Sequence, residues 1–290
     1  MQAVACLAAG TAATENQQNS NDPGLRPFVE QMAFPPASNQ GIVLTARDGG
    51  VFNYGTAQFH GSMGGQRLNA PVVGIAETPD GGGYWEVASD GGVFNFGDAA
   101  FYGSMGGQHL NAPVVGIAAT PDGHGYWLVA SDGGVFRFGD AQFHGSMGGQ
   151  HLNAPVVGIA ASGDGGGYFL VASDGGVFNF GDAGFFGSAG GLHLNAPVTG
   201  IAATPDGGGY WLAGSDGGVF NYGDAGFYGS VPGQGIVGQP PVVGISRTPS
   251  GAGYWLVGSN GAVYTYGDAA FLGSPDGTRL NAPVSGIASP

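Results

Sequence analysis

The sequence has no lysine and only one cysteine among its 290 residues. Its basic residues are six arginines, and 20 acidic residues outnumber them, which gives a formal net charge of −14 at pH 7. Nucleic-acid affinity comes mostly from Lys and Arg groups that neutralise phosphates, so we expect no nucleic-acid partner. The same charge disfavours binding to an anionic membrane surface. No apolar run of about 18 residues occurs, so we expect no transmembrane segment.

The single cysteine, Cys6, cannot form a disulfide within the chain, and a fold without disulfides is compatible with any compartment. It lies in residues 1–40, which begin apolar and small and then become rich in Asn, Gln and Pro. We interpret residues 1–40 as an N-terminal tail made of a signal-peptide remnant and a linker. A disordered cytosolic tail is the alternative.

What the chain has in abundance is glycine, with 62 residues, and a repeated unit. An Asp-Gly-Gly turn followed by an aromatic segment recurs every 42 residues, and Asn260 takes the same place 44 residues after the last copy. A period of about 40 to 45 residues with several short strands is typical of a β-propeller blade. The aspartates of the five turns are Asp48, Asp90, Asp132, Asp174 and Asp216.

Each unit predicts short strands and no helix. In the unit that begins at Pro71, apolar or aromatic segments lie at 72–76, 84–89, 93–96 and 101–104, with turns rich in Gly, Asp and Pro between them. β-branched and aromatic residues favour strands, and Asp-Gly turns favour hairpins. We therefore predict an all-β fold with four short antiparallel strands in each blade.

Five units are complete, and a sixth is divided between the two ends of the propeller. Its pieces are residues 41–62 and 283–290, which rebuild one unit when the second is placed before the first. We predict a six-bladed β-propeller over residues 41–290, closed by pairing of the C-terminal strand 284–288 with the N-terminal strands of 42–62. Closure of this kind removes exposed sheet edges. An open solenoid is the alternative.

The unit resembles two known groups of repeats. The pattern PxxGIAxxPDGxGYxxVASDGGVFxFG is similar to the NHL repeat, which builds six-bladed propellers. The longer pattern GYWLVASDGGVFNFGDAAFYGS resembles more closely a repeat of secreted actinobacterial proteins, some of them attached to cell-wall hydrolases or peptidases. The resemblance covers residues 41–290. It implies the propeller architecture and a location outside the cell or at the cell surface.

The resemblance does not supply catalytic residues. Some NHL propellers bind RNA through basic faces, which this acidic chain lacks. Others are lyases whose axial metal ions are held by His and acidic residues from different blades, and no such irregular cluster stands out here. The turn aspartates are interpreted as structural, because a short carboxylate bonds nearby backbone N–H groups. We predict no metal site, no cofactor and no catalytic residue.

The connectors between blades carry the candidate ligand-binding residues. Their pattern QHLNAP offers His or Arg together with Asn in most copies, which predicts similar pockets between neighbouring blades. Equivalent positions lie too far apart to share a Zn²⁺, whose bonds are roughly 2 Å long. Alternatively, each Asn stabilises the turn before Ala-Pro and each His is exposed without a role. The candidates are Arg67, Asn69, His109, Asn111, His151, Asn153, His193, Asn195, Arg279 and Asn281.

Three aromatic positions recur in the unit. The one predicted to form the interblade core never varies: Phe59, Phe101, Phe143, Phe185, Phe227 and Phe271. The next residue varies and includes Tyr102 and Tyr228, which could stack on a sugar ring or be half-buried edge side chains. An aromatic of the second strand is predicted to be core in five units, at Trp85, Trp127, Phe169, Trp211 and Trp255.

Two charged residues break the repeat in adjacent blades. Glu86 replaces a leucine and Arg137 replaces an asparagine or threonine, so we expect them to pair across the interface.

Near-identical pockets gain avidity on a polymer with repeated epitopes. The sequence therefore favours a secreted, non-enzymatic, monomeric propeller that binds a glycan of the cell envelope or its surroundings. A protein-interaction or spacer scaffold, with a cell-surface protein as partner, is the alternative. A hydrolase or lyase would need asymmetric polar residues around the axis, which such similar repeats do not predict.

Overall fold

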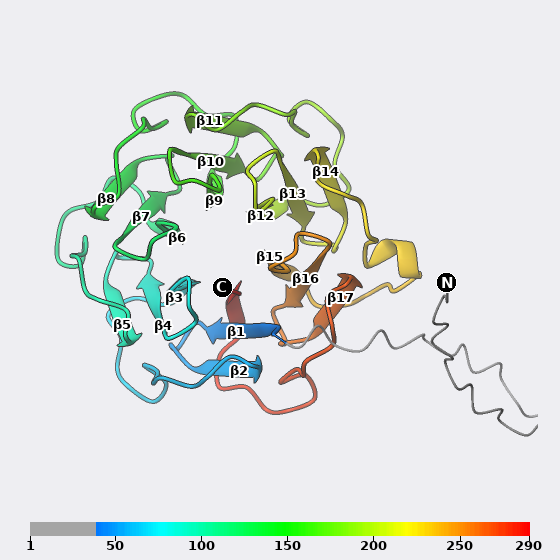
Figure 1. Ribbon diagram of the computed structural model, residues 1–290, viewed down its shortest axis with the longest axis horizontal. Helices are drawn as coiled ribbons and strands as arrows, with labels where there is room; N and C mark the ends of the chain where they lie inside the picture. The colour runs from blue at the N-terminus through cyan, green and yellow to red at the C-terminus, as the bar shows by residue number, and fades with distance from the viewer. Residues whose placement is uncertain (1–38) are drawn as a thin grey trace, which may run out of the picture. The chain divides into compact units, whose positions relative to one another are not determined.

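A computed structural model describes residues 39–290, so the predicted tail lies outside the described residues except for positions 39 and 40. The described chain forms six three-stranded antiparallel sheets around a central axis (Figure 1). This arrangement is a six-bladed β-propeller, which confirms the predicted fold class. Within the described residues, no helix is long and apolar enough to cross a membrane.

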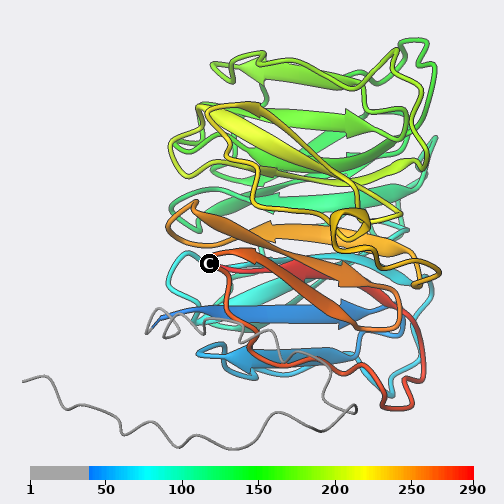
Figure 2. The ribbon, with the colours of Figure 1, turned by 90° about the vertical axis from the view of Figure 1, so that its right-hand side faces the viewer.

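Each blade consists of an inner, a middle and an outer strand, which run across the thickness of the disc (Figure 2). The inner strands are β3 (Val72–Glu77), β6 (Val114–Ala119), β9 (Val156–Ala161), β12 (Val198–Ala203), β15 (Val242–Arg247) and β18 (Val284–Ala288). The middle strands are β1 (Gly41–Ala46), β4 (Gly83–Ala88), β7 (Gly125–Ala130), β10 (Gly167–Ala172), β13 (Gly209–Gly214) and β16 (Gly253–Gly258). The outer strands are β2 (Val51–Gly55), β5 (Val93–Gly97), β8 (Val135–Gly139), β11 (Val177–Gly181), β14 (Val219–Gly223) and β17 (Val263–Gly267).

The turns divide between two faces of the ring. The face that carries the Asp-Gly-Gly turns, such as 89–92, and the connectors, such as 104–113, is called the DGG face. The opposite face, called the TPDG face, carries turns such as 78–82 and 97–100. The short 3₁₀ helix η1 (Pro232–Gln234) belongs to the connector that departs from the repeat.

The ring closes as predicted, because β18 completes the blade of β1 and β2. The two ends of the propeller pair in antiparallel register, with Leu44 opposite Ile287. The backbone N–H of Arg47 adds a hydrogen bond of 2.9 Å to the carbonyl of Pro283. The closing blade therefore joins residues from both ends of the repeat region without a covalent link.

The inner strands meet at a ring of glycines. A Cβ at Gly74 would lie 3.3 Å from Cγ1 of Val87 and 3.5 Å from Cγ2 of Ile117 in the neighbouring blade, so a methyl group would be tightly packed and a larger side chain would clash. This close approach explains why the inner strand has glycine at its third position. The glycines are Gly74, Gly116, Gly158, Gly200, Gly244 and Gly286.

The core lies between blades and is aromatic. Trp85 is fully buried, and its ring centroid lies 5.5 Å from that of Tyr126 in the next blade. Its indole N–H donates a 2.7 Å hydrogen bond to the carbonyl of Ala100, so the polar atom of the side chain is satisfied. The equivalent residues Trp127, Phe169, Trp211 and Trp255 are buried as well, which confirms the predicted core role of this position.

The fourth strand predicted in each blade is wrong, since every described sheet has three strands. Segment 101–104 bonds to the next blade instead of pairing with β5. The N–H of Tyr102 donates to the Tyr126 hydroxyl at 3.3 Å, and that hydroxyl donates to the carbonyl of Gly103 at 2.6 Å. Gly103 has φ 132°, which side chains disfavour. The segment therefore connects blades rather than extending one.

Candidate functional site

Pockets of similar shape open on the DGG face between neighbouring blades. Three of them, of about 320, 230 and 300 Å³, follow one another around the ring. Each pocket is bordered on one side by a connector from one blade. On the other side lie the Asp-Gly-Gly turn of the next blade and a phenylalanine of its outer strand. The predicted repetition of pockets thus has a counterpart in the structure.

The connectors place the predicted polar residues at these pockets in pairs. Arg67 and Asn69 line the first, with Asp90 and Phe101 opposite them. His109 and Asn111 line the second, across from Asp132. His151 and Asn153 line the third, across from Asp174 and Phe185. All six connector residues are exposed. Each pocket therefore combines a basic or imidazole group, an amide and a carboxylate beside aromatic surface.

The remaining connectors hold their residues at the same positions of the repeat. His193, Asn195, Arg279 and Asn281 are all exposed. The connector with η1 is different: the Gln239 amide there donates a 2.7 Å hydrogen bond to the carbonyl of Asp216. The sequence departure at 231–240 thus removes the His-Asn pair from one of the six connectors.

The six invariant phenylalanines are exposed, so their predicted role as interblade core is wrong. Their exposed fractions range from 54 to 65%. The side chains alternate along the extended segment, and the residue after each phenylalanine takes the interblade place. The Tyr102 ring lies 6.4 Å from Trp85 and 5.9 Å from Tyr126, measured between centroids. Sequence invariance therefore marks a surface feature here.

Tyr102 and Tyr228 do not join the connector residues. Their hydroxyls donate to the carbonyls of Gly123 and Gly251, at 3.1 and 3.3 Å, on the TPDG face of the next blade. Tyr102 is half-buried, whereas Tyr228 keeps 37% of its surface exposed. Of the two roles weighed for this position, the structure shows the half-buried one for Tyr102.

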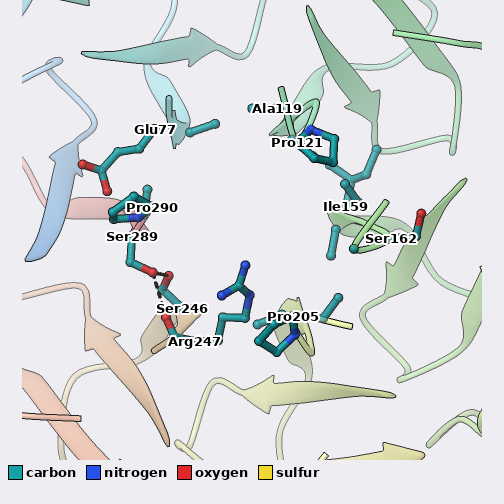
Figure 3. Close-up of a pocket in the computed structure, with 18 of the residues that line it drawn as sticks. Glu77, Ala119, Pro121, Ile159, Ser162, Pro205, Ser246, Arg247, Ser289 and Pro290 are labelled. Atoms are coloured by element: carbon teal, nitrogen blue, oxygen red, sulfur yellow. Dashed lines mark hydrogen bonds between the residues drawn. The ribbon is translucent and has the colours of Figure 1, made fainter. Parts of the chain in front are cut away.

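The axis carries a cavity at each face. The cavity on the DGG face, about 500 Å³, is lined by small and apolar residues such as Val73, Val115 and Val157, with Arg47 at its edge. The cavity on the TPDG face, about 420 Å³, contains Glu77 and Arg247 (Figure 3). The similarity of the repeats predicts no asymmetric polar residues around the axis, but Glu77 and Arg247 stand in only two of the six blades at its TPDG end.

Burial shifts the ionisation of both charged groups in this second cavity. Glu77 is 8% exposed, and desolvation raises the pKa of its carboxyl to about 8. Desolvation also lowers the pKa of Arg247. Among residues 39–290 no ion pair joins the two side chains. The sequence signal was available: the inner strand ends in alanine in three blades but in Glu77 and Arg247 in two others.

One group on the TPDG face has the composition of a metal site. Ligand atoms of Asp122, His124 and Asp140 lie within 4.8 Å of one another, and all three residues are exposed. The His124 ring contacts the Asp122 carboxylate at 3.3 Å. Hydrogen bonds from the Thr120 hydroxyl and the His124 backbone N–H hold the pKa of Asp122 well below its usual range. The turn itself therefore stabilises this carboxylate, as expected for a structural aspartate.

Glu86 and Arg137 do not form the predicted pair. Glu86 is buried and accepts a hydrogen bond from the Thr45 hydroxyl of the closing blade, whereas Arg137 is exposed on β8. The interpretation was wrong because the Glu86 side chain packs toward the preceding blade. Burial raises the pKa of Glu86 to about 7, and the hydrogen bond from Thr45 opposes that shift.

No family model matches the sequence, and no curated protein matches it. Among solved structures, the chain is similar to a β-propeller in the crystal structure of a nidogen/laminin complex, with a TM-score of 0.56 and 10% sequence identity. The similarity covers 87% of this chain and 98% of the other. At this identity it supports the fold alone.

Proposed function

We propose that the chain is a non-enzymatic binding protein that recognises a repetitive glycan through the pockets of its DGG face. The observation that carries this proposal is the recurrence of one pocket composition at successive blade interfaces. A polymer presents the same epitope at intervals, so several weak pockets on one rigid ring bind it with avidity. A single small ligand would require only one such pocket.

The groups at the pockets suit a sugar. Asn69 and Asp90 supply amide and carboxylate groups that can bond hydroxyls, and the exposed Phe101 offers a flat apolar surface beside them. A phenylalanine is exposed at the same position of all six units, so each blade offers the same apolar surface. The net charge of −14 repels polyanions, so the glycan we propose is neutral or bears amino groups.

The setting we propose is outside the cell or on its surface, where such polymers occur. The resemblance of the unit to secreted actinobacterial repeats supports this location.

The test is binding of the full chain to an array of cell-envelope and extracellular polysaccharides, followed by titration with oligomers of increasing length. We expect affinity to rise with length by about 10²-fold or more once an oligomer spans two pockets. The triple variant His109→Ala, His151→Ala, His193→Ala should lose this gain. His124→Ala, which removes an exposed histidine from the TPDG face, is the matched control. Length-independent binding, or binding unchanged in the triple variant, would contradict the proposal.

A protein-binding scaffold is the second candidate. It is favoured by the exposed phenylalanine in each blade and by the similarity to a propeller solved within a protein complex. A blank array with the folded protein, together with capture of a cell-surface protein that requires Phe101, Phe143 and Phe185, would favour this candidate.

A further inference from the structure

The axial cavity on the TPDG face is independent of the proposed glycan pockets, which open on the opposite face. Around it, the last position of the inner strand is a small Ala119, Ala161 or Ala203 in three blades. Glu77 and Arg247 take the same position in two other blades. Two unlike charges thus replace methyl groups at one end of the axis, on blades separated by the closing blade.

One oxygen of the Glu77 carboxyl lacks a hydrogen-bond partner within the described residues. The residue is 8% exposed and lines the cavity, and the atom without a partner is Oε2. A buried carboxyl without partners is costly, and most buried polar groups in folded proteins are paired. In Figure 3 the Glu77 side chain extends from β3 toward the closing blade, and its carboxyl lies near Pro290 at the border of the cavity, away from the Arg247 guanidinium. A bound cation would supply the missing partner.

Arg247 lines the same cavity from the blade on the other side of the closing blade. Its side chain reaches into the cavity (Figure 3), and it donates one long hydrogen bond of 3.3 Å, to the carbonyl of Thr248. The strand end that carries it is fixed by two serines. The Ser289 hydroxyl donates to the Arg247 carbonyl at 2.8 Å, and it lies 2.7 Å from the Ser246 hydroxyl. Ser246 also replaces an alanine of the repeat. The sequence therefore places a guanidinium here and fixes the backbone of the strand end that carries it.

We propose that this cavity binds a small zwitterion of the amino-acid or short-peptide class, with the ligand carboxylate on Arg247 and the ligand ammonium on Glu77. A ligand with one charge would leave the other charged group of the cavity without a partner. A planar guanidinium is suited to bidentate contact with a carboxylate. An approaching ammonium would lower the pKa of Glu77 and favour its ionised form.

The walls beside the two charged residues are small and apolar. The methyl groups of Ala119 and Ala161 and the rings of Pro121 and Pro205 border the cavity. Its volume of about 420 Å³ lies within the range of small-molecule sites, roughly 300 to 1,000 Å³. Glu77 and Arg247 are the charged side chains of the lining, so they decide which ionic groups the ligand carries.

The test is isothermal titration of the full chain with free amino acids and with dialanine. Matched probes are N-acetyl-dialanine, which lacks the ammonium, and dialanine amide, which lacks the carboxylate. The variants are Arg247→Ala and Glu77→Ala, both of which restore the residue that other blades carry, and the isosteric Glu77→Gln. Melting temperatures confirm that each variant is folded.

We expect a free amino acid or dialanine to bind the wild-type chain and each variant to weaken that binding by about 30-fold or more. N-acetyl-dialanine should bind weakly and should be insensitive to Glu77→Ala, because it lacks the ammonium that Glu77 would bind. Dialanine amide should bind weakly and should be insensitive to Arg247→Ala, because it lacks the carboxylate that Arg247 would bind. At neutral pH, binding should release protons, seen as a dependence of the measured heat on the buffer. Absence of binding by all the uncapped probes, or binding unchanged in the variants, would overturn the proposal.

The glycan proposal is tested separately on the same samples. His151→Ala should leave zwitterion binding unchanged, and Arg247→Ala should leave glycan binding unchanged. Either proposal can therefore fail while the other stands.

Discussion

The Thr45 hydroxyl donates a buried hydrogen bond to the Glu86 carboxyl, across the interface between the closing blade and the blade that follows it. Both residues depart from the repeat. Thr45 stands where other blades have a residue such as Val87, and Glu86 stands where they have a residue such as Leu128. Both are fully buried. The two departures thus pair with one another at the closing blade, while the second carboxyl oxygen of Glu86, Oε2, has no hydrogen-bond partner within the described residues.

This contact predicts strong coupling in a double-mutant cycle. Thr45→Val removes the donor and leaves the buried carboxyl unpaired, so it should destabilise the protein by about 1–3 kcal/mol. Adding Glu86→Leu, which restores the repeat at both positions, should recover that loss. The measurement is the free energy of unfolding in chemical denaturant for the wild type, both single variants and the double variant.

The control cycle combines Glu86→Leu with Arg137→Asn. These residues do not contact each other, so their effects should add to within about 0.5 kcal/mol. Coupling larger than that, or additive behaviour of the Thr45 cycle, would contradict the assignment of Thr45 as the partner of Glu86.

Glu77 predicts a pH-dependent loss of stability. Its pKa is raised from 4.5 to about 8 in the folded state, so the folded state binds the proton more tightly than the unfolded state. The free energy of unfolding should therefore fall as pH rises from 4.5 to 8, by at most about 1.4 kcal/mol per pH unit from this group. Glu77→Ala should match the wild type at about pH 4 and exceed its stability increasingly up to about pH 8. A difference between the two proteins that does not change with pH would contradict this account.

The repeat predicted the architecture because each unit carries its own strand and turn chemistry. The Asp90 turn and its 42-residue recurrence predicted the blades, and the divided sixth unit predicted the pairing of residues 284–288 with the N-terminal strands. The fourth strand failed for a local reason. Segment 101–104 is aromatic enough to read as a strand, but Gly103 and the Tyr126 hydroxyl direct its hydrogen bonds to the next blade.

Sequence could not tell which of two adjacent aromatics faces inward. Phe101 never varies and Tyr102 does, yet Tyr102 packs between blades and Phe101 is exposed. The interblade position accepts side chains as different as Tyr102, Phe186 and Leu272, whereas packing between blades does not explain why the exposed phenylalanine never varies. The axial residues Glu77 and Arg247 carried a sequence signal that was missed, since they stand where the inner strands of three other blades end in alanine.

In the closing blade, Gln40 takes over the interblade hydrogen bonding that a middle-strand tyrosine provides in the other blades. Most middle strands have a tyrosine, such as Tyr84, whose hydroxyl bonds the preceding blade at Gly61, but β1 has Ile42 at that position. The Gln40 side chain instead donates to the Asp268 carbonyl and accepts from the Ala270 N–H, both at 2.9 Å.

Gln40→Ala should therefore destabilise the protein by about 1–3 kcal/mol, because it leaves two backbone groups unpaired. Tyr84→Phe, which removes one interblade hydroxyl, is the reference and should cost about 1 kcal/mol. Denaturant unfolding measures both. A Gln40→Ala variant as stable as the wild type would show that the closing blade does not depend on this link.

Removal of an exposed phenylalanine should have little effect on the stability of the fold. Phe143→Ala removes a ring that is 54% exposed, so we expect a change in unfolding free energy within about 0.5 kcal/mol. Trp127→Ala, in the same blade, removes a fully buried ring and should cost about 3–5 kcal/mol. Thermal and denaturant unfolding would distinguish them. A Phe143→Ala variant with a large loss of stability would contradict the surface role of this position.

The closing strand β18 should pair with β1 even when it is supplied as a separate peptide. Without residues 283–290, the N–H and C=O groups on one side of β1 lose their partners, and an unpaired strand edge promotes aggregation. We expect the truncated chain to be less stable and to bind a peptide of residues 283–290, measured by fluorescence anisotropy of the labelled peptide.

A Gly286→Val peptide is the matched control. A Cβ at Gly286 would lie 3.2 Å from Thr45 Cγ2 and 3.5 Å from the Cα of Gly74, so the larger side chain should clash with both neighbours and abolish binding. Equal binding of the two peptides would mean that the peptide attaches elsewhere. A truncated chain as stable and monomeric as the full chain would mean that the ring does not need this strand. Binding of the native peptide alone would establish that six blades close because the first and last strands recognise each other by shape.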